Sequence, residues 1–168
     1  MPTATTRNRP PVRSAVVAAV LFAAAVALVA AVGSWAAATS AEQYAALRLP
    51  GWAPPAALFG PVWTVLYVLL AFAGWRLWYR AADGRELRRS LTWYGVGLVL
   101  NALWTPLFFA AQARAWALLD IALLDVAVVG LLVLAARRDR LAAAALVPYL
   151  LWVLYATALT AAILTLNG

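Results

Sequence analysis

Five long apolar runs, separated by short joints that carry most of the arginines, dominate the sequence. A bilayer core of about 30 Å is crossed by roughly 20 apolar residues in a helix, and each run reaches that length. Because 67% of the residues are hydrophobic and the runs occupy nearly the whole chain, no separate soluble module is expected. The sequence therefore predicts an all-α integral membrane bundle of five transmembrane helices, forming a single domain over residues 1–168.

The predicted helices follow a short polar arm at residues 1–13. Their expected ranges are 14–38, 55–79, 90–111, 116–136 and 141–166. The first run could also be read as a signal peptide, but it is longer than the roughly 7–15 apolar residues of a signal-peptide core, so a retained helix is favoured. The longest joint, residues 39–57, contains Pro54 and Pro55, which suit a loop leading into the first turn of a helix.

The arginines fall mainly on one side of the predicted bundle. All thirteen positive residues are arginines, and only Arg48 and Arg114 lie on the side opposite the N-terminal arm. Cytoplasmic loops of membrane proteins carry such an excess. We therefore expect a cytoplasmic N-terminus and a C-terminus on the opposite side. The same placement argues against a nucleic-acid partner, which the net charge of +7 could otherwise suggest.

Several residue types that carry chemistry are missing. Cys and His are absent, and Met1 is the only methionine. This excludes a disulfide framework, zinc sites of Cys or His, and nucleophiles built on Cys or on Ser with His. Tyr is the only usual axial ligand left for a haem iron. We therefore expect no catalytic residue, no metal site and no resident cofactor, and expect the function to be binding inside the bundle.

The nine tryptophans occupy two kinds of position. Trp75, Trp78 and Trp93 lie near the expected cytoplasmic interface, where aromatic belts are normal. Other aromatic residues share helix faces, because spacings of three, four, seven or eight residues bring side chains to one face. These faces comprise Phe59, Trp63 and Tyr67; Asn101, Trp104 and Phe108; and Trp152, Tyr155, Ala156 and Leu159.

One amide and two carboxyl side chains are expected deep within the predicted helices, namely Asn101, Asp120 and Asp125. Asn101 could join helices by hydrogen bonds or orient a ligand in an aromatic cavity, and the sequence favours neither role. Asp120 could cap a helix or pair with Arg114 or Arg48, and a proton relay through Asp125 is the less favoured hypothesis for that residue. The two acids lie about 140° apart around one helix, so they do not form a paired acid–base site.

Ordered motifs over about residues 44–160 resemble the TspO/MBR family of tryptophan-rich sensory and translocator proteins. They are LPGWAPP at 49–55, FGPVWTVLY at 59–67, LNALWTPLFF at 100–109, WALLD at 116–120 and PYLLW at 148–152, followed by Ala156 and Thr157. The resemblance implies a five-helix bundle, often dimeric, with a cavity near the non-cytoplasmic side under the loop between the first two helices. Family ligands are porphyrins and other tetrapyrroles, sterols, and synthetic isoquinoline carboxamides or benzodiazepines.

Position by position, the resemblance implies ten ligand-binding residues in this chain. They are Trp52, Phe59, Trp63, Tyr67, Asn101, Trp104, Phe108, Trp116, Trp152 and Ala156. The chain departs from the family at Leu49, where Lys is common, and at Thr160, where Asn is common. Residues 161–168 also lack the Tyr and the basic residue of the mammalian sterol-recognition segment, which puts cholesterol specificity in doubt.

The function expected from these observations is a membrane receptor, sensor or transporter that binds porphyrin, haem and similar flat hydrophobic molecules. An enzyme that degrades porphyrins in light and a scaffold without a ligand are the alternatives, and the enzyme is the less favoured because no acid–base pair is present. Expected partners are membrane lipids, a sterol or lipid in the cavity, and a second copy of the chain. Gly95 and Gly97 would allow a close dimer contact on the helix at 90–111.

Overall fold

The computed structural model describes residues 10–37 and 40–167. Arg7, Arg9 and the predicted end of the first helix at residue 38 lie outside this part of the chain. Five described helices are long and apolar enough to cross a membrane, and the described residues contain no strand. The predicted all-α bundle of five transmembrane helices is therefore confirmed.

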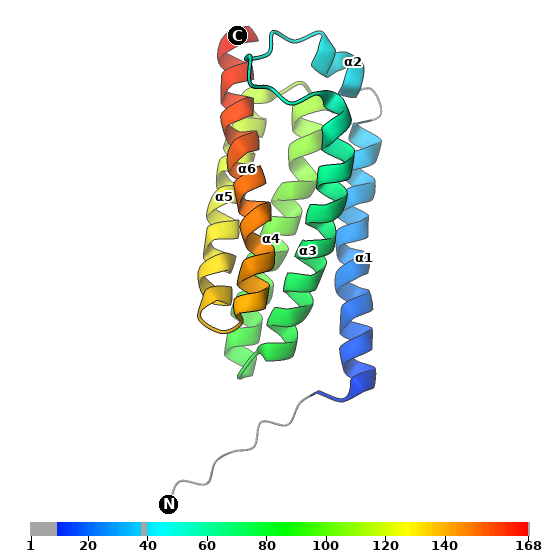
Figure 1. Cartoon of the computed structure of the whole chain (residues 1–168), viewed down its shortest axis with the longest axis vertical. Coiled ribbons are helices and arrows are strands. Elements are labelled where there is room, and N and C mark those ends of the chain that lie inside the picture. The colour runs from blue at the N-terminus through cyan, green and yellow to red at the C-terminus, as the bar shows by residue number, and fades with distance from the viewer. Residues whose placement is uncertain (1–9, 38–39, 168) are drawn as a thin grey trace, which may run out of the picture.

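The five spanning helices stand side by side (Figure 1). They are α1 (Val12–Ala36), α3 (Phe59–Arg80), α4 (Gly84–Thr105), α5 (Arg114–Ala136) and α6 (Arg140–Asn167). Short elements lie between them: α2 (Ser40–Ala45) in the longest joint, the 3-10 turn η1 (Ala56–Leu58) before α3, and the π-helical turn η2 (Pro106–Ala110) after α4. Helix α2 was not predicted, because six residues without an apolar stripe show no helical periodicity.

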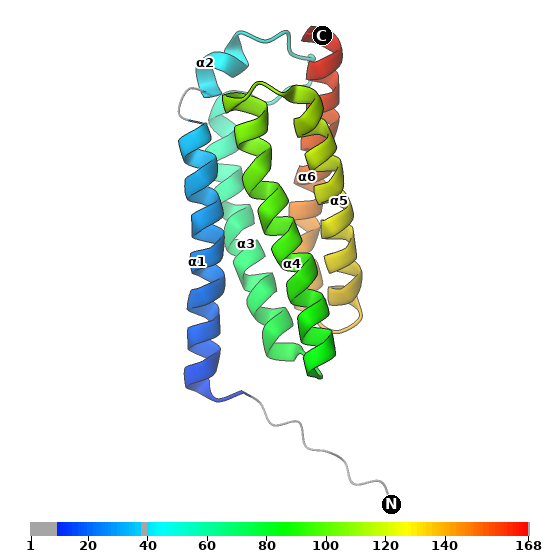
Figure 2. The same ribbon diagram turned by 180° about the vertical axis from the view of Figure 1, so that it is seen from behind.

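The helices close into a ring in which α1 contacts α3 and α4, α5 contacts α4 and α6, and α6 returns to α3. Figure 2 shows α4 at the front of the bundle, between α1 and α5. The core lies where α3, α5 and α6 meet, and its largest fully buried side chains include Tyr149, Leu124, Leu146 and Val153. Because a spanning helix is apolar on all sides, its burial pattern and not its hydrophobicity identifies the inner face.

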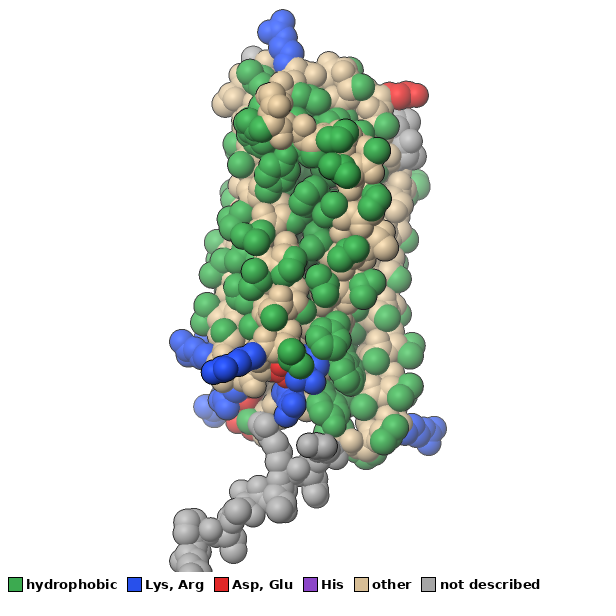
Figure 3. Space-filling model, viewed as in Figure 1, with side chains coloured by type: hydrophobic (Ala, Val, Ile, Leu, Met, Phe, Trp, Pro, Cys, Tyr) green, Lys and Arg blue, Asp and Glu red, His purple; other side chains and the backbone are tan. Residues whose placement is uncertain are grey.

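The two ends of the bundle differ in charge. One end carries the start of α1 and the α3–α4 and α5–α6 turns, and we call it the arginine end. Arginine side chains gather there in Figure 3, whereas the wall above them is largely hydrophobic. The opposite end carries α2, the loop that follows it and the end of α6, and we call it the cavity end.

Helix α4 begins at Gly84, six residues before the predicted start at Ser90. The Asp83 side chain accepts hydrogen bonds from the main-chain N–H groups of Glu86 at 2.8 Å and Arg85 at 2.9 Å, so it caps the helix. These two donors, that of Glu86 first, hold the pKa of Asp83 below its ordinary value. The first turns of α4 were not predicted because their residues are mostly charged and do not form an apolar run. The capping residue is nevertheless recognisable in the sequence.

A buried carboxylate ties the two turns of the arginine end together. Asp139 pairs with Arg76 at 2.7 Å and with Arg80 at 3.5 Å, and its side chain is only 2% exposed. The same carboxylate accepts from the main-chain N–H groups of Leu141 and Ala142, so it also caps α6. One residue therefore fixes the start of α6 against the last turns of α3.

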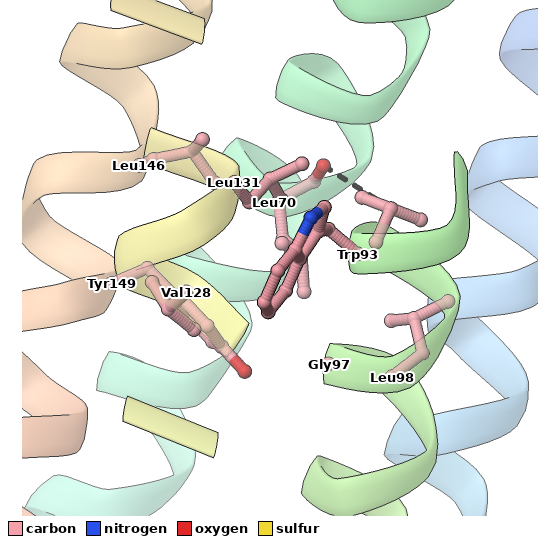
Figure 4. Close-up of a pocket in the computed structure, with 9 residues that line it drawn as sticks. Leu70, Trp93, Gly97, Leu98, Val128, Leu131, Leu146 and Tyr149 are labelled. Carbon is pink, nitrogen blue, oxygen red and sulfur yellow. Dashed lines mark hydrogen bonds between the residues drawn. The ribbon is translucent and has the colours of Figure 1, made fainter. Parts of the chain in front are cut away.

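Two glycines admit aromatic rings to the helix backbone in the arginine half. A Cβ on Gly74 would lie 2.6 Å from the Phe22 ring and 2.7 Å from the Tyr94 ring, and one on Gly130 would lie 3.0 Å from the Trp93 ring. Figure 4 shows Trp93 reaching from α4 toward α5. The apolar pocket around it measures only about 10 Å³, which is the room of a single water-sized sphere, so the helices are closely packed around Trp93.

Candidate functional site

A partly open cavity of about 430 Å³ occupies the cavity end, between α1, α2, α3 and the end of α4. Its size falls within the roughly 300–1,000 Å³ of small-molecule sites. The described residues that line it are aromatic residues and residues with small side chains. They include Ser, Thr and Tyr, which carry hydroxyl groups, and no Arg, Asp or Glu. Such a lining suits an uncharged, apolar ligand body that accepts or donates few hydrogen bonds.

Helix α3 supplies the aromatic wall predicted from its spacing. Phe59, Trp63 and Tyr67 all line the cavity, and the rings of Trp63 and Tyr67 lie 5.2 Å apart with a tilt of 31°. Trp104 of α4 also lines the cavity, and its ring stacks at 5.3 Å on that of Phe108, which does not line it. Flat aromatic ligands pack well against such ring faces.

Helix α1 supplies the opposite wall, which sequence reasoning missed. The cavity is lined there by Ala30, Gly33, Ser34 and Ala37. None of these residues is aromatic or ionisable, so none was a candidate. A signal was nevertheless present, because small residues spaced three, four and seven apart form one smooth face on a transmembrane helix. Their smallness leaves the space that the larger rings of α3 and α4 border.

A chain of side-chain hydrogen bonds starts at the cavity and crosses the bundle. The Tyr67 hydroxyl donates to Asn101 Oδ1 at 3.0 Å, and Asn101 Nδ2 donates to the Tyr149 hydroxyl at 2.9 Å. Asn101 is 4% exposed and joins α3, α4 and α6, which is the interhelical role weighed from the sequence. It does not line the cavity, and it acts on the wall only by holding the Tyr67 hydroxyl.

The other candidate residues lie behind or outside this wall. Phe108 and Ala156 are buried, and Trp152 packs edge-on against Phe59 at 6.1 Å between ring centres. Trp52 is 49% exposed and Trp116 is 66% exposed, and neither lines the cavity. The structure thus brings four of the ten candidates together at the cavity and leaves six around it.

The loop after α2 is held over the cavity end mainly by its main chain. The Asn167 side chain accepts from Arg48 N–H at 2.9 Å and donates to the Arg48 carbonyl at 3.0 Å. The Tyr155 hydroxyl donates to the carbonyl of Trp52 at 2.9 Å, and the two rings lie 5.6 Å apart. The end of α6 therefore determines where the loop lies.

Tyr44 connects α2 to the same loop from the cavity side. Its hydroxyl donates to the carbonyl of Pro54 at 3.1 Å, and its ring meets Phe59 edge-on at 5.4 Å. Burial, with a smaller effect of Tyr155, raises the pKa of Tyr44 above its ordinary value. The hydroxyl therefore stays protonated and keeps donating at neutral and moderately alkaline pH.

Comparison with known proteins identifies the family to which the chain belongs. A family model for the TspO/MBR family matches residues 19–166. The chain belongs to the TspO/MBR family. With its five spanning helices, this TspO/MBR protein is an integral, multi-pass membrane protein.

Relatives from three domains of life support the assignment to the TspO/MBR family. The chain is 39% identical over 127 residues to a tryptophan-rich protein TspO of Archaeoglobus fulgidus, covering 74% of this chain and 80% of the relative. It is 36% identical over 117 residues to the human translocator protein, covering 69% of each chain. It is 33% identical over 126 residues to the tryptophan-rich sensory protein of Cereibacter sphaeroides, covering 75% and 77%.

The intramembrane acids of this TspO/MBR chain lie away from the cavity on α5. Asp120 is 6% exposed, and its Oδ2 has no hydrogen-bond partner among the described residues. Asp125 Oδ2 lies within hydrogen-bond distance, 2.8 Å, of the Thr157 hydroxyl oxygen of α6. The described part of the chain forms no ion pair at either acid and no cluster of three acidic side chains that could hold a metal ion.

Proposed function

We propose that this protein binds tetrapyrroles, such as porphyrin and haem, and similar flat hydrophobic molecules in the cavity between α1, α3 and α4. The observation that carries the proposal is a cavity of about 430 Å³ with Trp63, Tyr67 and Trp104 in its wall. A macrocycle could lie against these rings and shed its apolar surface from water, which favours binding roughly in proportion to area. Relatives named translocator protein and tryptophan-rich sensory protein support transport or sensing as the use of that binding.

Shape and stacking, not iron ligation, should hold the macrocycle. The chain has no His or Cys, and no charged side chain lines the described cavity. The hydroxyl groups of the two lining tyrosines are engaged, because Tyr44 donates to the carbonyl of Pro54 and Tyr67 donates to Asn101 Oδ1. A metal-free porphyrin should therefore bind about as tightly as haem. Of the ten candidate residues, Phe59, Trp63, Tyr67 and Trp104 are proposed to contact the ligand. Asn101, Phe108, Trp152 and Ala156 support this wall, and Trp52 and Trp116 flank it.

Quenching of tryptophan fluorescence by protoporphyrin tests the proposal with purified protein. Aromatic stacking on one base is worth about 1–3 kcal/mol in nucleic-acid complexes, and a porphyrin face offers at least as much area. Trp63→Ala and Trp104→Ala should each weaken binding by roughly ten-fold or more, since about 1.4 kcal/mol is a factor of ten. Trp35→Ala is the matched control, because Trp35 lies at the same end of the bundle and is 75% exposed. Equal losses in all three variants would place the ligand elsewhere.

We also propose that the arginine end faces the cytoplasm, which puts the cavity near the opposite face of the membrane. The basis is the excess of arginine at the α3–α4 and α5–α6 turns. A reporter that is active only in the cytoplasm should be silent when fused after Gly168. Activity of that fusion would reverse the proposed orientation.

A further inference from the structure

Six described threonines lie in helices, and one of them differs from the rest. Five place their hydroxyl oxygen within hydrogen-bond distance of a main-chain carbonyl of their own helix, as helical threonines commonly do. They are Thr64, Thr92, Thr157, Thr160 and Thr165. Thr105, the last residue of α4, has no hydrogen-bond partner for its hydroxyl among the residues that the structure describes. Because Thr105 lines the cavity and its oxygen is not enclosed by protein, this hydroxyl is free to bond a ligand.

The hydroxyl oxygen of Tyr67 is the second polar group at this place, and the hydrogen bonds behind it fix its polarity. Asn101 Nδ2 donates to the Tyr149 hydroxyl at 2.9 Å, so the amide presents Oδ1 to Tyr67. Tyr67 gives its only hydroxyl hydrogen to that Oδ1 at 3.0 Å. A phenol oxygen that has donated its hydrogen still has lone pairs that accept. Toward the cavity, Tyr67 is therefore an acceptor and not a donor.

Gly33 of α1 leaves open the position that these two oxygens border. A Cβ on Gly33 would lie 3.6 Å from Thr105 Oγ1 and 3.9 Å from the Tyr67 hydroxyl oxygen, which are the nearest atoms from other helices. All three residues line the cavity. Helices α1 and α3 stand side by side at this end, below α2 (Figure 1). A ligand group beside Gly33 therefore meets one oxygen that donates or accepts and one that only accepts.

We propose that Gly33, Tyr67 and Thr105 form a subsite for an uncharged hydroxyl group on an otherwise apolar ligand. The ligand O–H donates to the Tyr67 oxygen and its oxygen accepts from the Thr105 hydroxyl, while the apolar body lies along the aromatic rings of the cavity. An ionised carboxylate does not fit, because Tyr67 turns lone pairs toward it and no cationic side chain lines the described cavity. The subsite rests on the proposed function, since it selects among the flat hydrophobic molecules that the cavity is proposed to bind.

Water is the competing occupant of the subsite, because a water molecule makes the same two hydrogen bonds. A ligand hydroxyl that displaces the water restores both bonds, whereas a methyl group leaves two polar atoms unpaired and loses affinity. The subsite therefore acts through the difference in affinity between ligands that carry the hydroxyl and ligands that lack it. A site built to bond a hydroxyl group discriminates more strongly in this way than apolar contact alone does.

Three pyrenes substituted at the same ring position test the subsite in the full chain, purified in detergent micelles. Pyrenylmethanol donates and accepts hydrogen bonds, pyrenecarbaldehyde only accepts them, and methylpyrene does neither. Energy transfer from tryptophan to pyrene reports binding. Pyrenylmethanol should bind about five-fold more tightly than methylpyrene and about three-fold more tightly than the aldehyde, as expected for neutral hydrogen bonds. Ratios of dissociation constants are compared between variants, so that partition of each pyrene into the micelle cancels.

Thr105→Val removes the hydroxyl at nearly unchanged size and should lower the preference for the alcohol over methylpyrene to less than about two-fold. Gly33→Ala fills the position beside both oxygens and should do the same. Tyr67→Phe should abolish the difference between the alcohol and the aldehyde. Thr64→Val is the matched control, because Thr64 also lines the cavity but its hydroxyl already donates to the carbonyl of Gly60 at 2.9 Å. This control should keep the preference of about five-fold.

Equal affinities of the wild type for pyrenylmethanol and methylpyrene would overturn the subsite, and so would an equal loss of preference in Thr64→Val and Thr105→Val. Aldehyde binding as tight as alcohol binding would overturn it too, because Tyr67 would then be the donor. In these cases the pyrenes still bind, so the proposed function stands. Failure of all three pyrenes while protoporphyrin binds would overturn the subsite alone, and failure of protoporphyrin as well would overturn both proposals. If Tyr67→Phe does not fold, Thr105→Val and Gly33→Ala carry the test.

Discussion

The two ends of this bundle are built from the same five helices and are packed in opposite ways. In the arginine half, Gly74 and Gly130 admit rings against the helix backbone, and the pocket beside Trp93 measures only about 10 Å³. At the cavity end, small residues of α1 face large rings of α3 and leave about 430 Å³. A close-packed half can hold the helices in register while the other half keeps room for a ligand.

The turns at the two ends are also held by different chemistry. At the arginine end, the carboxylates of Asp83 and Asp139 cap α4 and α6, and Asp139 pairs with Arg76 besides. At the cavity end, uncharged side chains form hydrogen bonds with the main chain of the loop, as Asn167 does with Arg48. Hydrogen bonds between neutral groups are worth less than charge-assisted ones, so the cavity end should open more readily.

Asp139→Asn should produce the largest loss of stability, because it breaks the ion pairs of the arginine end. Asn can still cap α6, but Arg76, whose side chain is 15% exposed, would lose its charged partner. Removing one partner of a fully buried pair costs about 3–5 kcal/mol, and the partial exposure here reduces the expectation to roughly 2–3 kcal/mol. Unfolding in mixed detergent micelles measures it. Glu86→Gln is the control, since the Arg138 side chain is 54% exposed and such pairs contribute less than about 1 kcal/mol.

The same glycine substitution should have opposite consequences at the two ends. Gly74→Ala puts a methyl group 2.6 Å from the Phe22 ring, and the overpacking should cost about 1–3 kcal/mol. Gly33→Ala puts it 3.6 Å from Thr105 Oγ1, an ordinary contact, so the better helix propensity of Ala should leave stability unchanged or raise it by up to about 1 kcal/mol.

Protoporphyrin binding should also distinguish substitutions at Gly33 from those at Gly74. Gly33→Leu places a larger side chain in the cavity and should abolish protoporphyrin binding while the protein stays folded, as judged by its thermal unfolding in detergent. If Gly33→Leu binds protoporphyrin like the wild type, the cavity between α1 and α3 is not the site. If Gly74→Ala is as stable as the wild type, the contrast in packing between the two halves is wrong.

The sequence predicted the number and order of the spans because bilayer thickness sets a length that apolar runs reveal directly. It also predicted the face formed by Phe59, Trp63 and Tyr67, because helical spacing fixes which side chains share a direction. It did not reveal which neighbour each face meets. Trp116 begins the family motif WALLD at 116–120, yet it is 66% exposed in the structure, because a motif does not say which of its residues are buried.

The position of the cavity could not be predicted from the sequence either, because it depends on which helix faces meet. A cavity forms where side chains are too small to fill the space between helices, and Gly33 and Ser34 of α1 are such residues. The ion pairs of Asp139 were equally hidden, because Arg76 and Asp139 lie far apart in the chain and meet only after α3 and α6 pack together. The start of α4 could have been predicted, since Asp83 followed three residues later by Glu86 is a helix-start pattern.

Asn167→Ala should loosen the cavity end without unfolding the bundle. The change removes both hydrogen bonds to the main chain of Arg48, each worth about 1 kcal/mol in an exposed setting. The amide of Arg48 should then exchange with deuterium about five-fold faster or more, whereas amides of α3 should be unaffected. Thr165→Ala is the control, since its hydroxyl bonds only within α6, to Ala162. Unchanged exchange at Arg48 would show that Asn167 does not hold the loop.

Asp125→Asn should have the smallest effect, because we expect Asp125 to be uncharged within the bilayer, as Asn is. The Thr157 oxygen lies 2.8 Å from Asp125 Oδ2 and 3.0 Å from the carbonyl of Val153, but its hydroxyl has only one hydrogen. If that hydrogen goes to Val153, as in helical Thr residues generally, Asp125 must carry a proton and donate it to Thr157. An unpaired carboxylate in the middle of α5 would also be costly within the bilayer. Asn preserves the donor, so stability should change by less than about 0.5 kcal/mol. The infrared spectrum of the variant should lose the carbonyl band of one protonated carboxylic acid. A stability loss above about 1 kcal/mol with no change in that band would show instead that Asp125 is ionised.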